Sequence, residues 1–278
     1  MTGKLLPVLL SLLLMLTACT AHRGPDGVVP GDETKQTEEP ASETPGPGEE
    51  PGEDTPDTDR GQTGTGEEPV RWYPRGIGMP LATDDPAHQD DKVVMLTFDD
   101  GPSQTDSTAR ILDVLKAEGV RAVFFVTGYG AKHTDMLRRI AEEGHVIGLH
   151  TVTHSDLTTL TPEEIRAELV PLMETIETVT GQRPRYLRPP FGAYNDQVLA
   201  VAAELGLEVV TWTSGSLDWE GTDASGYKDP AVVVADVMSQ LYPGAVYLFH
   251  DTLLHTAEAL PTIIQRMQAE GYEFVVLP

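Results

Sequence analysis

Short apolar segments alternate with amphipathic segments from residue 92 to the end of the sequence. Seven of the apolar segments have the length and the β-branched or aromatic content of strands, and they lie at 93–98, 122–128, 146–150, 185–190, 208–213, 245–250 and 273–278. Six segments with apolar residues at helical spacing lie at 106–117, 134–143, 162–178, 196–205, 230–241 and 257–270. This alternation predicts an α/β fold whose parallel strands are joined by right-handed crossovers.

The predicted strands are apolar on both faces, as is typical of strands covered by helices. A barrel and a doubly wound sheet both fit this pattern, and in both of them a site lies at the carboxyl ends of the strands. Residues able to bind a metal or transfer a proton follow five of the strands; they are Asp99, Asp100, His150, His154, Arg188, Asp218 and His250. We therefore expect one site that collects side chains from several strands.

His150 and His154 lie four residues apart in the sequence HTVTH. On a helical turn, two imidazoles at this spacing project from one face and can hold one metal ion. The spacing alone is equally compatible with two polar loop histidines. With Asp100 as a third ligand, the set has two nitrogens and one oxygen and leaves positions open for water and substrate, which is typical of a catalytic zinc site. Cobalt, nickel or manganese would suit the same donors.

Residues 1–19 have the layout of a bacterial export signal, with one early lysine, an apolar run and then small residues. The run ends in Leu-Thr-Ala-Cys, which resembles the lipobox in which the cysteine becomes the lipidated first residue of the mature protein. An ordinary cleaved signal with an incidental cysteine is the alternative. Cys19 is the only cysteine, so we expect no internal disulfide and a lipid-anchored protein on the outer side of the cell membrane, facing the cell wall.

Residues 20–91 are rich in Pro, Glu, Asp, Thr and Gly and poor in large apolar residues. Such a segment cannot bury enough apolar surface to offset its ordering entropy, so we expect a disordered acidic tether before a folded domain at 92–278. The tether carries about −13 of the net charge of −25, and this acidity argues against a nucleic-acid partner. The more apolar segment 70–82 is predicted to dock on the folded domain.

Five motifs of the folded part occur in a fixed order: TFDDGP, HTVTH, RPPFG, LDW and LFH. Together they resemble the polysaccharide deacetylases of the NodB-homology type, carbohydrate esterase family 4, over the whole of 92–278. The resemblance implies a distorted (β/α) barrel with about seven parallel strands, and a metal-dependent hydrolase that removes N-acetyl groups from amino sugars or O-acetyl groups from some glycans.

The resemblance also implies roles for individual residues. Asp100, His150 and His154 match the metal ligands, with zinc as the expected ion. Asp99 matches the general base, and Arg188 matches the arginine that orients and ionises this base.

The resemblance further implies that His250 is the general acid and that Asp218 pairs with this histidine and tunes it. The backbone N–H of Phe191 would stabilise the oxyanion, while Trp219 and Leu248 would form the wall around the acetyl methyl group. Two residues depart from the family pattern. Phe191 replaces a tyrosine, which removes a phenol hydroxyl, and Gly215 replaces the first aspartate of D-x-x-D-W, which puts the substrate fit of that loop in doubt.

The leading hypothesis is a monomeric peptidoglycan deacetylase. A chitin-oligosaccharide deacetylase and an acetylxylan-type O-acetyl esterase are alternatives within the same chemistry. A non-catalytic carbohydrate-binding protein is the alternative from another class, although a binding module would have no need for both a base and an acid.

Overall fold

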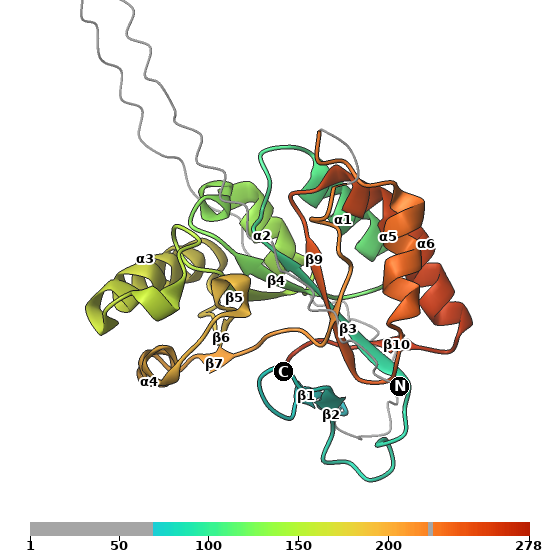
Figure 1. Ribbon diagram of the computed structural model, residues 1–278, viewed down its shortest axis with the longest axis horizontal. Coiled ribbons are helices and arrows are strands. Elements are labelled where there is room, and N and C mark those ends of the chain that lie inside the picture. The colour runs from blue at the N-terminus through green and yellow to red at the C-terminus, as the bar shows by residue number, and fades with distance from the viewer. Residues whose placement is uncertain (1–68, 222–224) are drawn as a thin grey trace, which may run out of the picture. The chain divides into compact units, whose positions relative to one another are not determined.

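Strand β3 (Val93–Asp99) lies at the centre of a parallel sheet and is buried along its whole length (Figure 1). The computed structural model describes residues 69–221 and 225–278, so the predicted signal at 1–19, including Cys19, lies outside the described residues. The strands are ordered β7-β6-β5-β4-β3-β9-β8, and β10 pairs with the beginning of β3. The other strands are β4 (Val123–Val126), β5 (Val146–Leu149), β6 (Tyr186–Leu187), β7 (Glu208–Val209), β8 (Ser214–Gly215), β9 (Ala245–His250) and β10 (Glu273–Phe274).

Helices follow the strands and cover the outer face of the curled sheet (Figure 1). They are α1 (Ser107–Ala117), α2 (Thr134–Glu142), α3 (Pro162–Thr180), α4 (Asp196–Glu204), α5 (Pro230–Ser239) and α6 (Leu254–Ala269). Helices α5, α6 and α1 pack side by side, as do α2, α3 and α4. Among the described residues, none of the helices is both long and apolar enough to cross a membrane. The prediction of a distorted (β/α) barrel with parallel strands is confirmed.

The segment 208–213, which we expected to be one strand, instead changes its partner halfway. The N–H of Val210 donates to the carbonyl of Leu187 on one edge of the sheet, and the N–H of Thr213 donates to the carbonyl of Val246 on the other side. Residues 208–209 therefore form β7 beside β6, and residues 214–215 form β8 beside β9. This short link joins the two ends of the strand order and curls the sheet into its barrel shape.

Alternation along β3 separates two apolar cores. Val94, Leu96 and Phe98 contribute to the core between the sheet and the helices. Val93 and Met95 contribute to a second core inside the barrel. Thr97 and Asp99 continue the inner series toward the carboxyl end of the strand, so the barrel interior changes from apolar to polar along β3.

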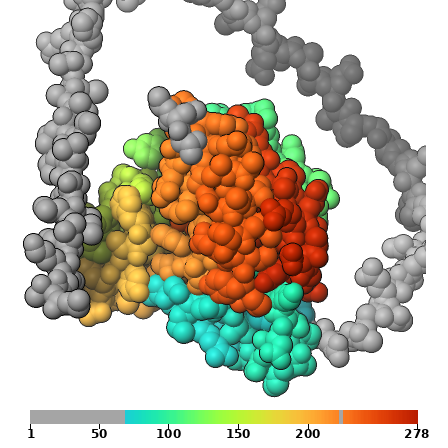
Figure 2. Space-filling view, turned by 45° about the vertical axis from the view of Figure 1, so that its right-hand side comes forward, coloured from blue at the N-terminus to red at the C-terminus, as the bar shows by residue number. Residues whose placement is uncertain are grey.

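Residues 69–91 belong to the folded domain, although the sequence analysis predicted that they are part of the tether. Two short antiparallel strands, β1 (Tyr73–Pro74) and β2 (Leu81–Ala82), form here, and Trp72 and Leu81 are buried in the inner core. The N–H of Leu81 donates to the carbonyl of Gly244, just before β9 begins. Figure 2 shows this segment in cyan against the base of the domain. The docking predicted for 70–82 is confirmed, because the side chains of Trp72 and Leu81 close the amino end of the barrel. The folded domain therefore begins before the predicted boundary at residue 91.

We predict that Trp72→Ala lowers the free energy of unfolding by about 3 kcal/mol, because a buried indole is lost from the inner core. Chemical denaturation measures this change. Met79→Ala is the matched control in the same segment: its side chain is exposed, and the expected change is within about 0.5 kcal/mol. Equal stability of the two variants would contradict the packing of this segment.

Candidate active site

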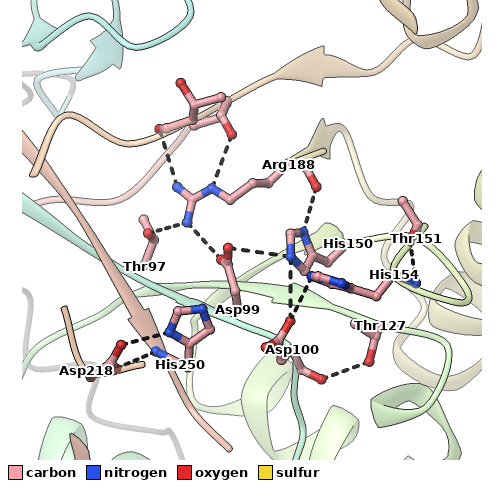
Figure 3. Close-up of polar contacts among 12 residues, drawn as sticks. Thr97, Asp99, Asp100, Thr127, His150, Thr151, His154, Arg188, Asp218 and His250 are labelled. Carbon is pink, nitrogen blue, oxygen red and sulfur yellow. Dashed lines mark hydrogen bonds and ion pairs between the residues drawn. The ribbon is translucent and has the colours of Figure 1, made fainter. Parts of the chain in front are cut away.

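The two neighbouring aspartates at the end of β3 point in different directions (Figure 3). Asp99 is the last strand residue and is buried on the inner side of the barrel. Asp100 has a φ of 81° and its N–H donates to the carbonyl of Phe125, so the chain leaves the strand sharply here. The left-handed conformation is unfavourable for a residue with a side chain, and such strain is common at functional sites.

Asp100, His150 and His154 form a cluster that could hold a metal ion. The Oδ1 atom of Asp100 lies 3.6 Å from Nε2 of His150 and 3.5 Å from Nε2 of His154. This oxygen is buried and has no hydrogen-bond partner among the described residues. A buried acceptor that faces two imidazole nitrogens is the arrangement that a bound cation satisfies, so these residues fit a divalent metal.

Neighbouring groups set the protonation of His150. Its Nδ1 lies 2.7 Å from the carbonyl oxygen of Arg188, which can only accept, so Nδ1 carries the proton and Nε2 presents a lone pair to the cluster. Burial lowers the pKa of His150 and favours this neutral form. The helical turn expected for the histidine pair does not form, because Thr151 and His154 have φ values of 68° and 60°. A hydrogen bond from the N–H of His154 to the hydroxyl of Thr151 closes the turn that brings the two rings together.

Arg188 lies inside the barrel with no solvent exposure. Its Nη1 donates to Oδ1 of Asp99 at 2.8 Å and to the hydroxyl of Thr97 at 2.6 Å. The guanidinium also lies 4.1 Å from the ring centroid of Phe125, a cation–π contact. The structure thus brings Arg188 and Asp99 together as the resemblance implied. The sequence analysis did not include Thr97 among the site residues. Its position two residues before Asp99, on the same face of the strand, could have indicated that it belongs to the site.

His250 and Asp218 form a second buried pair on the far side of the site. Nδ1 of His250 lies 2.8 Å from Oδ1 of Asp218, and the N–H of His250 donates to Oδ2 of the same carboxylate. The hydroxyl of Thr256 also donates to this carboxylate. Burial by itself lowers the pKa of His250. The hydrogen bond from His250 to Asp218 and the charge of this carboxylate outweigh burial and, with smaller contributions from Asp99 and Asp100, raise the pKa to about 9.

A pocket of about 350 Å³ joins the two halves of the site. The predicted substrate-binding residues Phe191, Trp219 and Leu248 line it together with the His/Asp cluster, Asp99 and His250. Trp212 also lines the pocket and was missed, because its sequence position appeared to lie within a strand. Phe191 has a φ of 62°, and its ring is 67% exposed and meets His154 edge-on, so the phenylalanine forms part of the rim.

The loop that departs from the family pattern at Gly215 is held by hydrogen bonds with Gln240. The side-chain amide of Gln240 accepts from the N–H of Gly215 and donates to its carbonyl at 2.8 Å. A β-carbon at this position would lie 3.3 Å from the indole of Trp219, so a larger residue would press on the pocket wall. Gly215 therefore lets Trp219 lie close to the loop backbone.

We predict that the imidazole of His250 titrates near pH 9 in the metal-free chain, and that Asp218→Asn lowers this pKa by at least about one unit. Histidine NMR signals followed between pH 5.5 and 10 measure the change. Because the folded-state pKa lies above the unfolded value of 6.5, the stabilisation from this pair is complete below pH 6.5 and is lost as the pH rises through 9.

His145 is the internal reference for this titration. Burial lowers its pKa to about 4, so it stays neutral over the measured range. The ring of this histidine is buried, and its Nδ1 accepts from the N–H of Ala122. A His250 signal that titrated near its ordinary value in the wild-type chain would contradict the role of Asp218.

Several deacetylases are similar in sequence to most of the part of this chain that the structure describes. The family model of the polysaccharide deacetylases matches residues 87–210. The peptidoglycan-N-acetylmuramic acid deacetylase PdaA of Bacillus subtilis is 37% identical over 186 residues, which are 66% of this chain and 69% of that protein. A peptidoglycan-N-acetylglucosamine deacetylase of Bacillus cereus is 36% identical over 190 residues, 66% of each protein.

Solved structures give the same assignment. A peptidoglycan N-acetylglucosamine deacetylase in complex with a benzamide ligand matches with a TM-score of 0.63 at 34% identity, over 68% of this chain and 87% of that chain. A pseudoenzyme of carbohydrate esterase family 4 from Bacillus anthracis matches with a TM-score of 0.61 at 31% identity, over 66% of this chain and 63% of that chain. The fold, the motif residues gathered in one pocket and these matches together show that the chain belongs to the polysaccharide deacetylase family, carbohydrate esterase family 4.

Proposed function

We propose that this chain removes N-acetyl groups from the amino sugars of peptidoglycan, with zinc as its metal. The observation that carries the proposal is the geometry of one pocket, which is lined by a carboxylate held by Arg188, an imidazole held by Asp218 and the His/Asp cluster. A base and an acid facing one substrate group are what hydrolysis of an amide requires. The relatives named for peptidoglycan deacetylation support the choice of polymer.

Asp100, His150 and His154 would hold the metal through one carboxylate oxygen and two Nε2 atoms. A divalent ion held there would polarise the acetyl carbonyl and lower the pKa of water, which is the chemistry that a zinc site with open positions supplies. Two nitrogens and one oxygen suit zinc well, and cobalt, nickel or manganese would also accept this donor set.

Asp99 acts as the general base. The charge-assisted hydrogen bond from Arg188 occupies Oδ1 of Asp99, which leaves Oδ2 on the side of the cluster, 3.7 Å from Nε2 of His150. From this position Oδ2 takes a proton from the water that attacks the acetyl carbon. Thr97 holds the same guanidinium nitrogen and so fixes the direction of the pair.

His250 acts as the general acid. With Nδ1 engaged by Asp218, the other ring nitrogen, Nε2, carries the exchangeable proton on the pocket side. The raised pKa keeps this proton in place near neutral pH. The amine of the sugar is a very poor leaving group until it is protonated, and donation from His250 completes the cleavage of the C–N bond.

Trp219 and Leu248 line the part of the pocket that would take the acetyl methyl group. Leu248 is buried and apolar, and Trp219 meets His250 edge-on with ring centroids 5.4 Å apart. The N–H of Phe191 is the proposed donor to the oxyanion.

We predict that the full-length chain, loaded with zinc, releases acetate from peptidoglycan, and that removal of the metal with a chelator abolishes the release. Asp99→Asn keeps the shape of the side chain but not the base, so we expect a loss of at least about 100-fold in kcat. An enzymatic assay for acetate, with chitin oligomers and acetylxylan as parallel substrates, measures both effects.

The same panel tests the alternatives. Acetate from chitin oligomers or acetylxylan but not from peptidoglycan would overturn the choice of polymer. Full activity of Asp99→Asn would refute the proposed base. Glycan binding without acetate release from any of the three substrates would favour a non-catalytic carbohydrate-binding protein, a possibility that the family's pseudoenzyme makes concrete.

We also propose that the chain is exported as a monomer and anchored to the membrane through Cys19, with the acidic segment before residue 69 as its tether. The lipobox-like end of the signal and the single cysteine support this proposal. An anchor at Cys19 would hold the domain near the cell wall, where its proposed substrate lies.

We predict that Cys19→Ser abolishes labelling with radioactive palmitate in a bacterial host and moves the protein from the membrane fraction to the soluble fraction. The sequence has no other cysteine to take the label. Thr17→Ala keeps the cysteine and a small residue before it, so it should leave the labelling intact. A label that persisted in Cys19→Ser would contradict the anchor.

A further inference from the structure

Asp251, the residue after the proposed acid, is a buried carboxylate with no cation beside it. It is 1% exposed, and no lysine, arginine or histidine within the described ranges forms an ion pair with it. Its Oδ2 accepts a hydrogen bond of 2.8 Å from the hydroxyl of Thr108, while Oδ1 has no hydrogen-bond partner in the described part of the chain. Burying an acid in this way is unfavourable, so the position calls for an explanation.

The loop that follows the two aspartates of β3 wraps around Asp251. The N–H of Asp251 donates to the carbonyl of Asp99 at the beginning of this loop. The carbonyl of Asp251 accepts from the hydroxyls of Ser107, at 2.7 Å, and Thr108, at 3.2 Å, where the loop enters helix α1. One residue therefore holds both ends of the segment that carries Asp100.

Gly101, which directly follows Asp100, is packed tightly against this carboxylate. A methyl group at Gly101 would overlap both carboxylate oxygens of Asp251. On another side, a methyl group at Gly130 would overlap the carbonyl of Gly101. Gly101 is therefore packed against the carboxyl group of Asp251 on one side and against Gly130 on another, so the shape of Asp251 bears directly on the turn that carries Asp100.

We propose that Asp251 is a positioning residue that holds the Asp99–Asp100 turn at the distance from His150 and His154 that metal binding needs. The inference rests on the proposed function of the site, which names Asp100 as a metal ligand. Asp251 acts by its shape and by accepting the hydrogen bond from Thr108. The charges of Asp100 and Asp99 both disfavour a negative charge on Asp251, so the neutral amide of asparagine should replace its carboxyl group.

The affinity of the full-length chain for zinc alone, measured by calorimetry, tests this proposal without any need for catalysis. We expect Asp251→Ala to weaken zinc binding at least about tenfold, the effect typical of residues that support metal ligands. Asp251→Asn should stay within about threefold of the wild type. Ile176→Ala, a truncation in the buried face of α3 away from the site, is the control for lost stability and should bind zinc normally.

A second pair of variants tests whether Asp251 acts through the turn. Gly101→Ala should lose zinc affinity, because the new methyl group displaces the turn. The double variant Gly101→Ala/Asp251→Ala should bind zinc at least about tenfold more tightly than Gly101→Ala, because the methyl group then occupies the space of the lost carboxylate. Acetate release should follow the same order through kcat, with KM nearly unchanged.

Two results would overturn the proposal. An equal loss in Asp251→Asn and Asp251→Ala would assign the effect to charge, and a double variant no better than Gly101→Ala would show that the two residues do not act on each other. A wild-type chain that bound zinc but released no acetate would defeat the proposed function and leave the zinc measurements valid.

Discussion

The ion pair between Arg188 and Asp99 inside the barrel is the interaction on which the rest of the site depends. Arg188 has no contact with solvent, so every donor of its guanidinium must find an acceptor within the protein. Asp99, Thr97 and the carbonyls of Val210 and Thr211 supply these acceptors, and they come from β3 and from the link that closes the barrel. Removal of either partner would leave a buried charge without compensation, which is strongly destabilising. Barrel closure and the position of the proposed base are therefore parts of one arrangement.

This pair also explains how two aspartates can stand side by side. Asp99 faces the arginine, whereas the left-handed conformation of Asp100 turns its carboxylate toward the two histidines and the expected metal. With a metal bound at the cluster, each negative charge would have its own positive partner, and the repulsion between neighbours would be small against these attractions. The proposed division between a ligand and a base thus follows from backbone geometry and not from any chemical difference between the two residues.

Backbone strain is concentrated where this chemistry is expected. All five non-glycine residues with a positive φ among the described residues, Asp100, Thr151, His154, Phe191 and Leu217, lie in loops that follow β3, β5, β6 and β8. These loops all lie at the carboxyl-end edge of the sheet. Two apolar cores and the packing of Trp72 at the opposite end supply the rigidity that keeps such conformations in place. The tight packing of Asp251 against the turn at Gly101 belongs to the same pattern, because a strained turn needs a support of fixed shape.

The alternation of apolar and amphipathic segments was enough to predict an α/β fold with parallel strands, because burial patterns are local and repeat with the period of each element. The motifs likewise identified Asp99, Asp100, His150, His154, Arg188, Asp218 and His250 as neighbours, since parallel strands end at a common edge. The sequence could not predict that 208–213 divides between two strands, that Thr97 and Trp212 belong to the site, or that Asp251 supports the turn, because each of these depends on contacts with residues far along the chain. Residue types and their order determined the chemistry available to this protein, and only the tertiary structure decided which atoms face one another, because side-chain direction is set by the curled sheet and its closing link.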